Sequence, residues 1–320
     1  MSAGFRIAYV IFAHHKPYQL ERLLKRMDDG QAGFFLHIDR GSDIAEFKDA
    51  MAAVSHSPIT LVKRVGSIWG RIGEVKCALN AMAAVLDSRV RYDYVVSLSG
   101  QDYPIKPNRE IISFFEQNRK LNFVEHERMP CSFWFVDGGD GGMWRIERYH
   151  LRLFGKPTMY PEPPKPHTFK GNVFRIVRDL LCGLRFRTPR RFPKYLIPYG
   201  GTGSLNLSRE AVRYVLDFVR NHPDYLRFHR NTASPGEIFF HSILLNSRED
   251  LRDSIVNDSL RYMKWVRGNH PEILTTRELP ALRSANSLFA RKFDMDVDSE
   301  VLDVLDSSAR EESSNLRQSV

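Results

Sequence analysis

A carboxylate at the start of an apolar helix is the first candidate for chemistry in this sequence. Ser234-Pro235-Gly236-Glu237 comes directly before the apolar run 238–240. Serine at the N-cap, proline at the first helical position and glutamate at the third are typical of a capping box, in which side chains bond free backbone N–H groups. A glutamate fixed in this way can also accept a proton as a general base. The two roles are compatible, and both stay open for Glu237.

Two adjacent cations, Arg291 and Lys292, lie between aromatic residues in the segment Leu288–Phe293. A solvated basic pair is the common case for such a segment. The alternative is a diphosphate site, where fixed positive charge neutralises a leaving group.

Further candidate ligand-binding residues come directly after segments of the chain that are predicted to be β-strands. His14 and His15 come directly after the first apolar segment, and Asp39 ends the second. Ligands of open α/β sheets bind beyond the carboxyl ends of the strands. A ligand-binding role is therefore considered for these side chains beside the more common structural one.

The run Asp294–Asp298 has alternating carboxylates, which suggests a metal site. A calcium loop is excluded because Ser299 and Leu305 stand where glycine and glutamate are required. The run also lies near the C-terminus, not after a central strand where an Asp-x-Asp pair would meet a diphosphate. Asp102 does follow such a strand, but it has no second carboxylate two residues away. We therefore expect no metal and no cofactor.

Strand and helix patterns alternate along the first half of the chain. Period-two and buried patterns predict strands, and a 3.6-residue period predicts helices. The predicted strands are Phe5–Ala13, Phe34–Asp39, Ile59–Val62 and Tyr94–Leu98, and the predicted helices are Tyr18–Met27, Arg71–Leu86, Asn108–Gln117, Ser208–Phe218 and Pro235–Leu245. This order predicts an α/β fold with a central sheet flanked by helices.

We expect one domain over residues 1–300, with an excursion rich in proline and glycine at about 131–200 and a partly disordered tail at 301–320. Inside the excursion, Val173–Phe186 is basic and amphipathic. It is typical of a helix packed on the domain, and it would also suit an anionic membrane surface.

The formal net charge of +9 favours partners that carry phosphate, such as nucleotides, anionic lipids or nucleic acid. The basic residues are scattered and no nucleic-acid-binding module is present, so nucleic acid is not expected. Three cysteines without CxxC spacing indicate a reducing compartment. No segment is long enough for a membrane span or a signal peptide. We therefore predict a cytoplasmic protein. The more specific alternative is a cytoplasmic protein that binds peripherally to the inner face of the membrane.

Taken together, several segments resemble one family, the core 2/I-branching β-1,6-N-acetylglucosaminyltransferases and the peptide O-xylosyltransferases (glycosyltransferase family fourteen). The similarity covers residues 6 to about 298, and it depends on eight segments in the right order. They are Ala8–His14, Leu36–Asp39, Ser67–Gly70, Leu98–Lys106, Glu125–Pro130, Gly200–Ser204, Ser234–His241 and Leu288–Asp294.

The resemblance implies a GT-A type nucleotide-sugar-binding fold, inversion at the anomeric carbon and no metal. It implies that Glu237 is the catalytic base. The residues that it places at the donor are His14, Asp39, Trp69, Arg291 and Lys292, and those that it places at the acceptor are Glu125, Ser204 and Trp265. The donor would be UDP-xylose or UDP-N-acetylglucosamine, and the acceptor a hydroxyl of a glycan, a lipid-linked saccharide or a protein serine.

The chain departs from the family at two places. Similar enzymes carry an acidic residue just before the base, where this chain has Gly236, and the region 131–170 matches neither branch. The acceptor therefore stays open. Two other functions stay open as well: a UDP-sugar hydrolase, and a basic membrane- or nucleic-acid-binding protein without catalysis.

Overall fold

A mixed, seven-stranded sheet forms the centre of the part of the chain that the structure describes. The computed structural model describes residues 4–67, 70–137, 139–153, 156–160, 180, 190–265 and 270–318. The strands lie in the order β12 (Ile255–Val256), β6 (Asn122–Phe123), β11 (Asn206–Ser208), β4 (Tyr94–Ser99), β1 (Ile7–Ala13), β2 (Ala32–Ile38) and β3 (Ile59–Leu61). β1 is parallel to β2 and β4, whereas β11 is antiparallel to β4. The predicted α/β class with a mixed sheet is confirmed.

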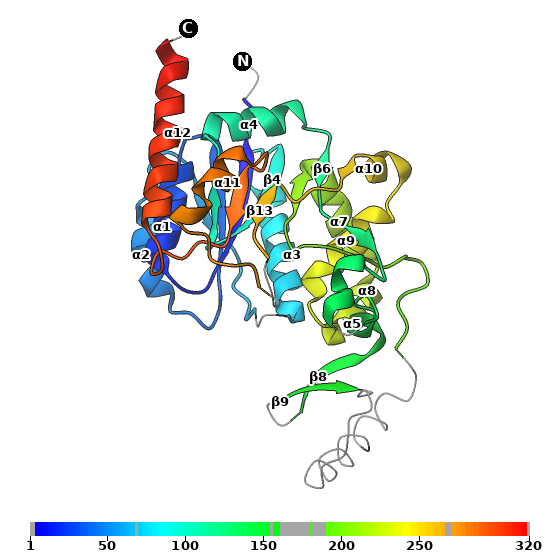
Figure 1. Ribbon diagram of the computed structural model, residues 1–320. Coiled ribbons are helices and arrows are strands. Elements are labelled where there is room, and N and C mark those ends of the chain that lie inside the picture. Colours follow the sequence, from blue (N-terminus) through cyan, green and yellow to red (C-terminus); the bar gives the residue numbers. More distant parts are fainter. Residues whose placement is uncertain are drawn as a thin grey trace.

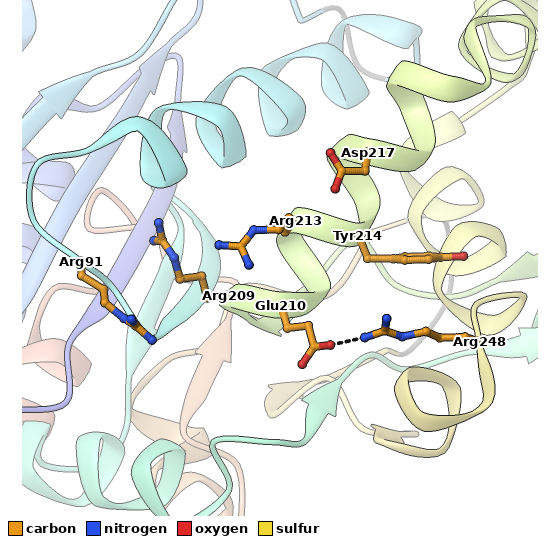
Figure 2. Close-up of a pocket in the computed structure, with 7 residues that line it drawn as sticks. All are labelled: Arg91, Arg209, Glu210, Arg213, Tyr214, Asp217 and Arg248. Carbon is orange, nitrogen blue, oxygen red and sulfur yellow. Dashed lines mark hydrogen bonds and ion pairs between the residues drawn. The ribbon is translucent and has the colours of Figure 1, made fainter.

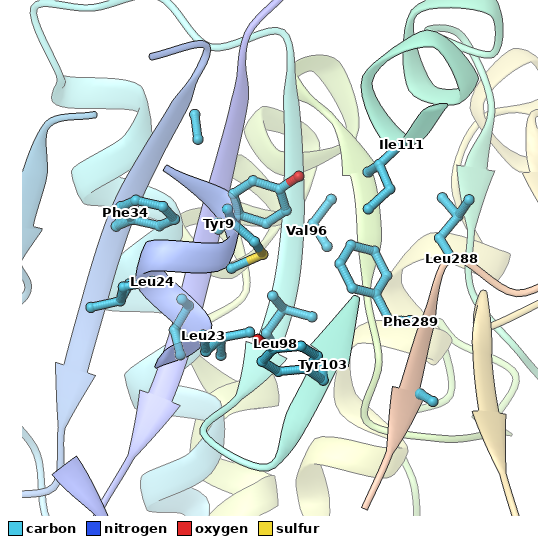
Figure 3. Packing of buried hydrophobic residues seen from close by; sticks show 14 of the residues in the cluster. Tyr9, Leu23, Leu24, Phe34, Val96, Leu98, Tyr103, Ile111, Leu288 and Phe289 are labelled. Atoms are coloured by element: carbon cyan, nitrogen blue, oxygen red, sulfur yellow. The ribbon is translucent and has the colours of Figure 1, made fainter. Parts of the chain in front are cut away.

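β1 lies inside this sheet because both of its faces are apolar. Ile7 and Tyr9 join one buried cluster, and Ala8 and Val10 join a second cluster on the opposite face. Figure 3 shows the first cluster, in which the ring of Phe34 from β2 stacks near that of Tyr9. Burial of apolar surface contributes roughly 25 cal/mol per Å², so a strand with two apolar faces is most stable between two layers.

Helices cover both faces of the sheet (Figure 1). The helices of the first cluster are α1 (Pro17–Met27), α4 (Asn108–Gln117), α11 (Leu279–Ser284) and α12 (Glu300–Gln318). Those of the second cluster are α3 (Ile72–Asp87), α7 (Arg209–Asn221), α8 (Pro223–Phe228), α9 (Phe239–Leu245) and α10 (Glu249–Asp253). The five predicted helices all exist, although Pro235–Leu245 is divided into a 3-10 turn, η4 (Pro235–Glu237), and α9.

A second sheet of three strands lies beyond the carboxyl end of β4. It consists of β13 (Arg261–Met263), β14 (Phe289–Arg291) and β5 (Asp102–Pro104). β14 is antiparallel to β5, and their register places Arg291 opposite Asp102. The sheet therefore brings the predicted cationic segment to the turn that follows β4.

The remaining elements are short. They are η1 (Ile44–Phe47), α2 (Lys48–Ala52), β7 (Glu127–Arg128), η2 (Ser132–Asp137), α5 (Trp144–Glu147), β8 (Tyr149–Leu153), β9 (Lys156–Tyr160), β10 (Tyr199–Gly200), η3 (His229–Asn231) and η5 (Thr276–Glu278). β8 and β9 form a hairpin that projects from the body in Figure 1. The predicted excursion thus contains a hairpin, and the stretch Val173–Phe186 lies outside the described residues except for Leu180, which is exposed.

Residues 300–318, in the segment predicted to be a partly disordered tail, form α12. Val301, Leu302 and Leu305 of this helix are buried in the first cluster. Arg22 of α1 also forms ion pairs with its carboxylates. The serine-rich, charged composition suggested disorder, but three apolar residues on one face suffice to dock the helix.

None of the helices in the described part of the chain combines the length and the apolar character that a bilayer crossing requires.

Candidate active site

The predicted donor-binding side chains gather at the carboxyl ends of β1, β2 and β4. His14 follows β1, Asp39 follows β2, and Arg291 and Lys292 reach the same edge from β14. Desolvation lowers the pKa of His14, and the neighbouring His15, Lys292 and Arg291 lower it further, whereas Asp39 opposes this effect. Four of the five residues predicted at the donor are therefore close enough to interact electrostatically. The fifth, Trp69, lies outside the described residues.

The Asp39 carboxylate is held in place by the loop that follows β3. One of its oxygens accepts hydrogen bonds from the backbone N–H and the hydroxyl of Ser67, each at 2.6 Å, and the other accepts one from the backbone N–H of Gly41. Burial alone would raise the pKa of Asp39, but these bonds outweigh it and keep the pKa below its ordinary value. Asp39 is therefore an ionised, oriented acceptor for hydroxyl or N–H groups of a ligand.

Arg291 is oriented by Asp102, the carboxylate of the turn after β4. Its guanidinium contacts the hydroxyl of Ser99, and it lies 3.3 Å from the Asp102 carboxylate. On the other side, the buried Arg261 lies 3.5 Å from the same carboxylate. Two arginines thus share one carboxylate, which leaves net positive charge at this edge of the sheet.

Lys292 adds a second cation beside Arg291. In the described part of the chain its ammonium group has no hydrogen bond or ion pair. Its backbone is fixed, because its carbonyl oxygen accepts a hydrogen bond from the N–H of Leu274 at 2.8 Å. A positioned cation without an anionic partner is suited to a phosphate ligand.

The alternating carboxylates after Lys292 have partners within the protein. Lys16 forms ion pairs with Asp294 and Asp296, and Asp298 accepts hydrogen bonds from the backbone N–H groups of Thr276 and Val301. The run therefore ties the segment after β14 to the start of α1 and to η5.

A buried glutamine, Gln19, joins three segments of this edge. Its amide nitrogen donates to the carbonyl oxygens of Gly100 and Phe293 at 2.8 and 3.1 Å, and its amide oxygen accepts from the N–H of Met295 at 3.0 Å. Gln19 was not predicted from the sequence, since an apolar helix pattern does not distinguish a buried glutamine from an exposed one.

Glu237 lies in η4, where it forms an ion pair with Arg145 from α5. The Arg145 Nη1 and Glu237 Oε2 atoms are 2.5 Å apart, and the two side chains keep 11% and 33% of their exposed area. The guanidinium of Arg145 also lies 4.0 Å above the ring of Trp134. Glu237 is therefore held by a stacked arginine, yet it stays partly exposed to solvent.

The predicted capping box at this position is wrong. Ser234 has a left-handed backbone conformation and makes no capping hydrogen bond with its side chain. The carboxylate of Glu237 points to Arg145 and not to the N-cap backbone. Pro235 does occupy the first helical position, as predicted.

Among comparisons with known proteins, the profile described as Core-2/I-Branching enzyme matches residues 7–282. The chain belongs to this family.

Two relatives show how the chain compares with other proteins. The chain is 27% identical to human xylosyltransferase 2 over 323 residues, which cover 94% of this chain and 33% of that protein. It is 24% identical to human xylosyltransferase 1 over 326 residues, which cover 94% of this chain and 30% of that protein. The chain thus spans about a third of the length of the curated relatives it matches.

Solved structures give only a distant likeness. The apo form of mouse xyloside xylosyltransferase 1 aligns with a TM-score of 0.37 and 10% identity, over 90% of this chain and 97% of that chain.

In this Core-2/I-Branching family member, backbone contacts of Gly201 bring Glu125, one of the residues predicted at the acceptor, close to Glu237. The N–H of Gly201 donates to the Glu237 carbonyl oxygen at 2.9 Å, and a Cβ added to Gly201 would lie 1.9 Å from the Glu125 carbonyl oxygen. Gly201 therefore links Glu125, Glu237 and the loop that carries Ser204. Trp265 follows β13 and is 54% exposed.

A basic pocket also exists at the opposite edge of the sheet (Figure 2). Its cavity of about 450 Å³ is lined by Arg91, Arg209, Glu210, Arg213, Tyr214, Asp217 and Arg248. Arg248 is paired with Glu210 and Asp250, and Arg91 with Asp93. In the described part of the chain, neither Arg209 nor Arg213 has a carboxylate partner, so the pocket keeps positive charge. It lies at the amino ends of β1 and β4, however, and the carboxyl edge, where ligands of α/β sheets bind, remains the candidate active site.

Proposed function

We propose that the protein is an inverting glycosyltransferase that moves a sugar from a UDP-sugar to a hydroxyl acceptor. The observation that carries the proposal is the arrangement at the carboxyl edge of the sheet. Arg291 and Lys292 supply fixed positive charge, and Glu237, which lies within the family-matched residues 7–282, supplies a partly exposed carboxylate. A nucleotide-sugar transferase needs these two functions, a cationic diphosphate site and a base.

The proposed reaction is a single displacement. The acceptor oxygen attacks the anomeric carbon while Glu237 takes the hydroxyl proton, so an O–C bond forms as the bond from the anomeric carbon to the diphosphate oxygen breaks. UDP leaves from the opposite face, which inverts the configuration. Arg291 and Lys292 would stabilise the negative charge that grows on the leaving diphosphate.

The surroundings of Glu237 suit a base. Burial raises the pKa of Glu237, and the charge and hydrogen bond of Arg145 only partly offset this effect. A carboxylate whose pKa is raised binds a proton more strongly, and general bases are most effective when their pKa lies near the operating pH. Arg145 also restricts the carboxylate to one orientation.

We propose that transfer needs no metal ion. The carboxylates that could hold one are engaged by cations of the protein: Asp102 by Arg261 and Arg291, and Asp294 and Asp296 by Lys16. Arg291 and Lys292 would then take the role that a divalent ion has in other nucleotide-sugar enzymes.

The relatives are named xylosyltransferases, so UDP-xylose is the first donor to test and UDP-N-acetylglucosamine the second. A GT-A type fold, a glycan, lipid-linked or protein acceptor, an anionic membrane partner and a cytoplasmic location remain predictions.

A panel of UDP-sugars tests the proposal. A ligand that binds the folded state raises its melting temperature, and mass spectrometry of hydroxyl acceptors then detects the transferred sugar. UDP release at the same rate with and without acceptor would indicate a hydrolase instead. Binding to DNA or RNA that weakens steeply with salt, without UDP binding, would indicate a nucleic-acid-binding protein.

A further inference from the structure

A second carboxylate, that of Glu74, lies against the turn that carries Glu237. Glu74 is in the first turn of α3, and its Oε1 accepts a hydrogen bond from the Gly70 N–H at 2.7 Å. A Cβ added to Gly236 would lie 3.5 Å from Oε2 of Glu74. The Gly70 carbonyl oxygen in turn accepts from the Ser234 N–H at 3.0 Å. Glu74 therefore bonds the loop before α3, and this loop in turn bonds the turn that holds Glu237.

The groups that surround the Glu74 carboxyl group affect its protonation. The pKa of Glu74 is raised to about 7, mainly by burial and also by the negative charge of Glu237, although the hydrogen bond from Gly70 lowers it. Arg145 lies on the far side of Glu237 and is paired with it. Cys77, one turn along α3, has a thiol whose pKa burial raises to about 12, so it stays neutral.

We propose that Glu74 is a positioning residue of the catalytic centre, which holds the Ser234–Glu237 turn and sets the charge state of Glu237. This inference rests on the proposed function, in which Glu237 is the base. Glu74 acts on the reaction through Glu237 and need not touch the substrate.

The physical reason is that two carboxyl groups lie close together and only one of them, that of Glu237, is paired with a guanidinium. Two nearby carboxylates that are both ionised repel each other, so their protons leave in two coupled steps. When Glu74 is protonated, Glu237 faces only the positive charge of Arg145 and is a weaker base. When Glu74 is ionised, its negative charge raises the proton affinity of Glu237. The basicity of Glu237 would thus rise as Glu74 loses its proton near neutral pH.

Glu74→Gln tests the inference because the amide keeps the size and the acceptor oxygen that faces Gly70. The matched control is Glu110→Gln, an exposed first-turn glutamate of α4. Full-length proteins with ¹³C-labelled glutamate are titrated by NMR, and kcat/KM for transfer is measured from pH 4 to 9. We expect the carboxyl signal that titrates near pH 7 to vanish in Glu74→Gln. We also expect the acid limb of kcat/KM to move down by roughly half a pH unit or more, because a negative neighbour is lost. Glu110→Gln should change neither.

Each outcome is decisive, and thermal melts verify that every variant is folded. If Glu74→Gln is folded and keeps both the wild-type pH profile and every signal that titrates above pH 6, the inference is wrong and Glu74 only supports the Gly70 loop. Glu237→Gln separates this result from a failure of the proposed function. An inactive Glu237→Gln beside an unaltered Glu74→Gln rejects the Glu74 inference alone, whereas an active Glu237→Gln rejects the base and, with it, the role given to Glu74.

Discussion

The ion pair between Arg145 and Glu237 joins side chains that lie 92 positions apart in the chain. At the scale of residues, the sequence pointed to Glu237, Arg291 and Lys292 because carboxylates and cations near apolar segments are visible as patterns. Arg145 and Glu74 carry no such pattern, since only the packing of α5 and α3 against η4 brings them to Glu237. The partners of Glu237 that come from distant segments could therefore not be predicted.

Glu237→Gln should keep the fold and lower the rate of transfer about 100-fold or more, because a required general base contributes on this order. Glutamine retains the shape of the side chain but cannot take the proton. The control is Glu147→Gln, an exposed glutamate of α5 that should behave like the wild type. Single-turnover transfer and thermal melting give the measurement. Near-normal transfer by a stably folded Glu237→Gln protein would reduce this residue to a structural partner of Arg145.

At the scale of elements, periodicity predicted the helices well because their apolar faces are buried as the 3.6-residue period requires. Periodicity did not predict the local structure where contacts between distant segments determine it. The Ser234–Glu237 segment matches a capping box in sequence, but Arg145 takes the carboxylate and the turn becomes 3-10. In α12, docking on the core overrides a composition that suggests disorder.

Close packing in the loop between β10 and β11 can be tested by substitution. A Cβ on Gly201 would lie 1.9 Å from the Glu125 carbonyl oxygen and 2.7 Å from Nε2 of His241. Gly201→Ala should therefore lower the free energy of unfolding by about 1–3 kcal/mol, as overpacking does, and should reduce transfer by displacing Glu237. Gly203→Ala is the control, since a Cβ there meets nothing within 4 Å. Equal melting temperatures for the two variants would contradict this account.

At the scale of the whole molecule, topology predicted where the candidate donor-binding side chains would meet. Ligands of α/β sheets bind at the carboxyl ends of the strands, and the side chains after β1, β2 and β4 do meet there, joined by β14 from the far end of the chain. The net charge of +9 was less informative. It did not distinguish the carboxyl edge from the arginine pocket at the opposite edge.

The basic, amphipathic stretch Val173–Phe186 leads to a prediction for the whole protein. We expect it to bring the protein to anionic membranes, where each cation near the surface adds about 1 kcal/mol of attraction. Flotation with vesicles of acidic lipid should recover the protein, and flotation with neutral vesicles should not. Arg175→Glu combined with Arg178→Glu should reduce recovery, while a matched pair on α7, Arg213→Glu with Arg220→Glu, should not. Failure to float with either vesicle would leave this stretch with a structural role only.

Transfer without a divalent metal is the prediction that depends on the whole arrangement of charge. The leaving diphosphate gains negative charge in the transition state, so fixed positive charge must face it. Arg291, oriented by Asp102, and Lys292, whose ammonium group has no ionic partner in the described part of the chain, can supply that charge. Activity should therefore persist in excess EDTA without added magnesium or manganese.

Lys292→Ala should lower kcat roughly 100-fold or more, as loss of a transition-state contact does, with little change in melting temperature and no rescue by metal. Lys194→Ala is the control, since Lys194 lies in an exposed turn far along the chain from β14. Loss of all activity in EDTA, restored by manganese, would overturn this assignment and make Asp294 and Asp296 the candidates for a metal site.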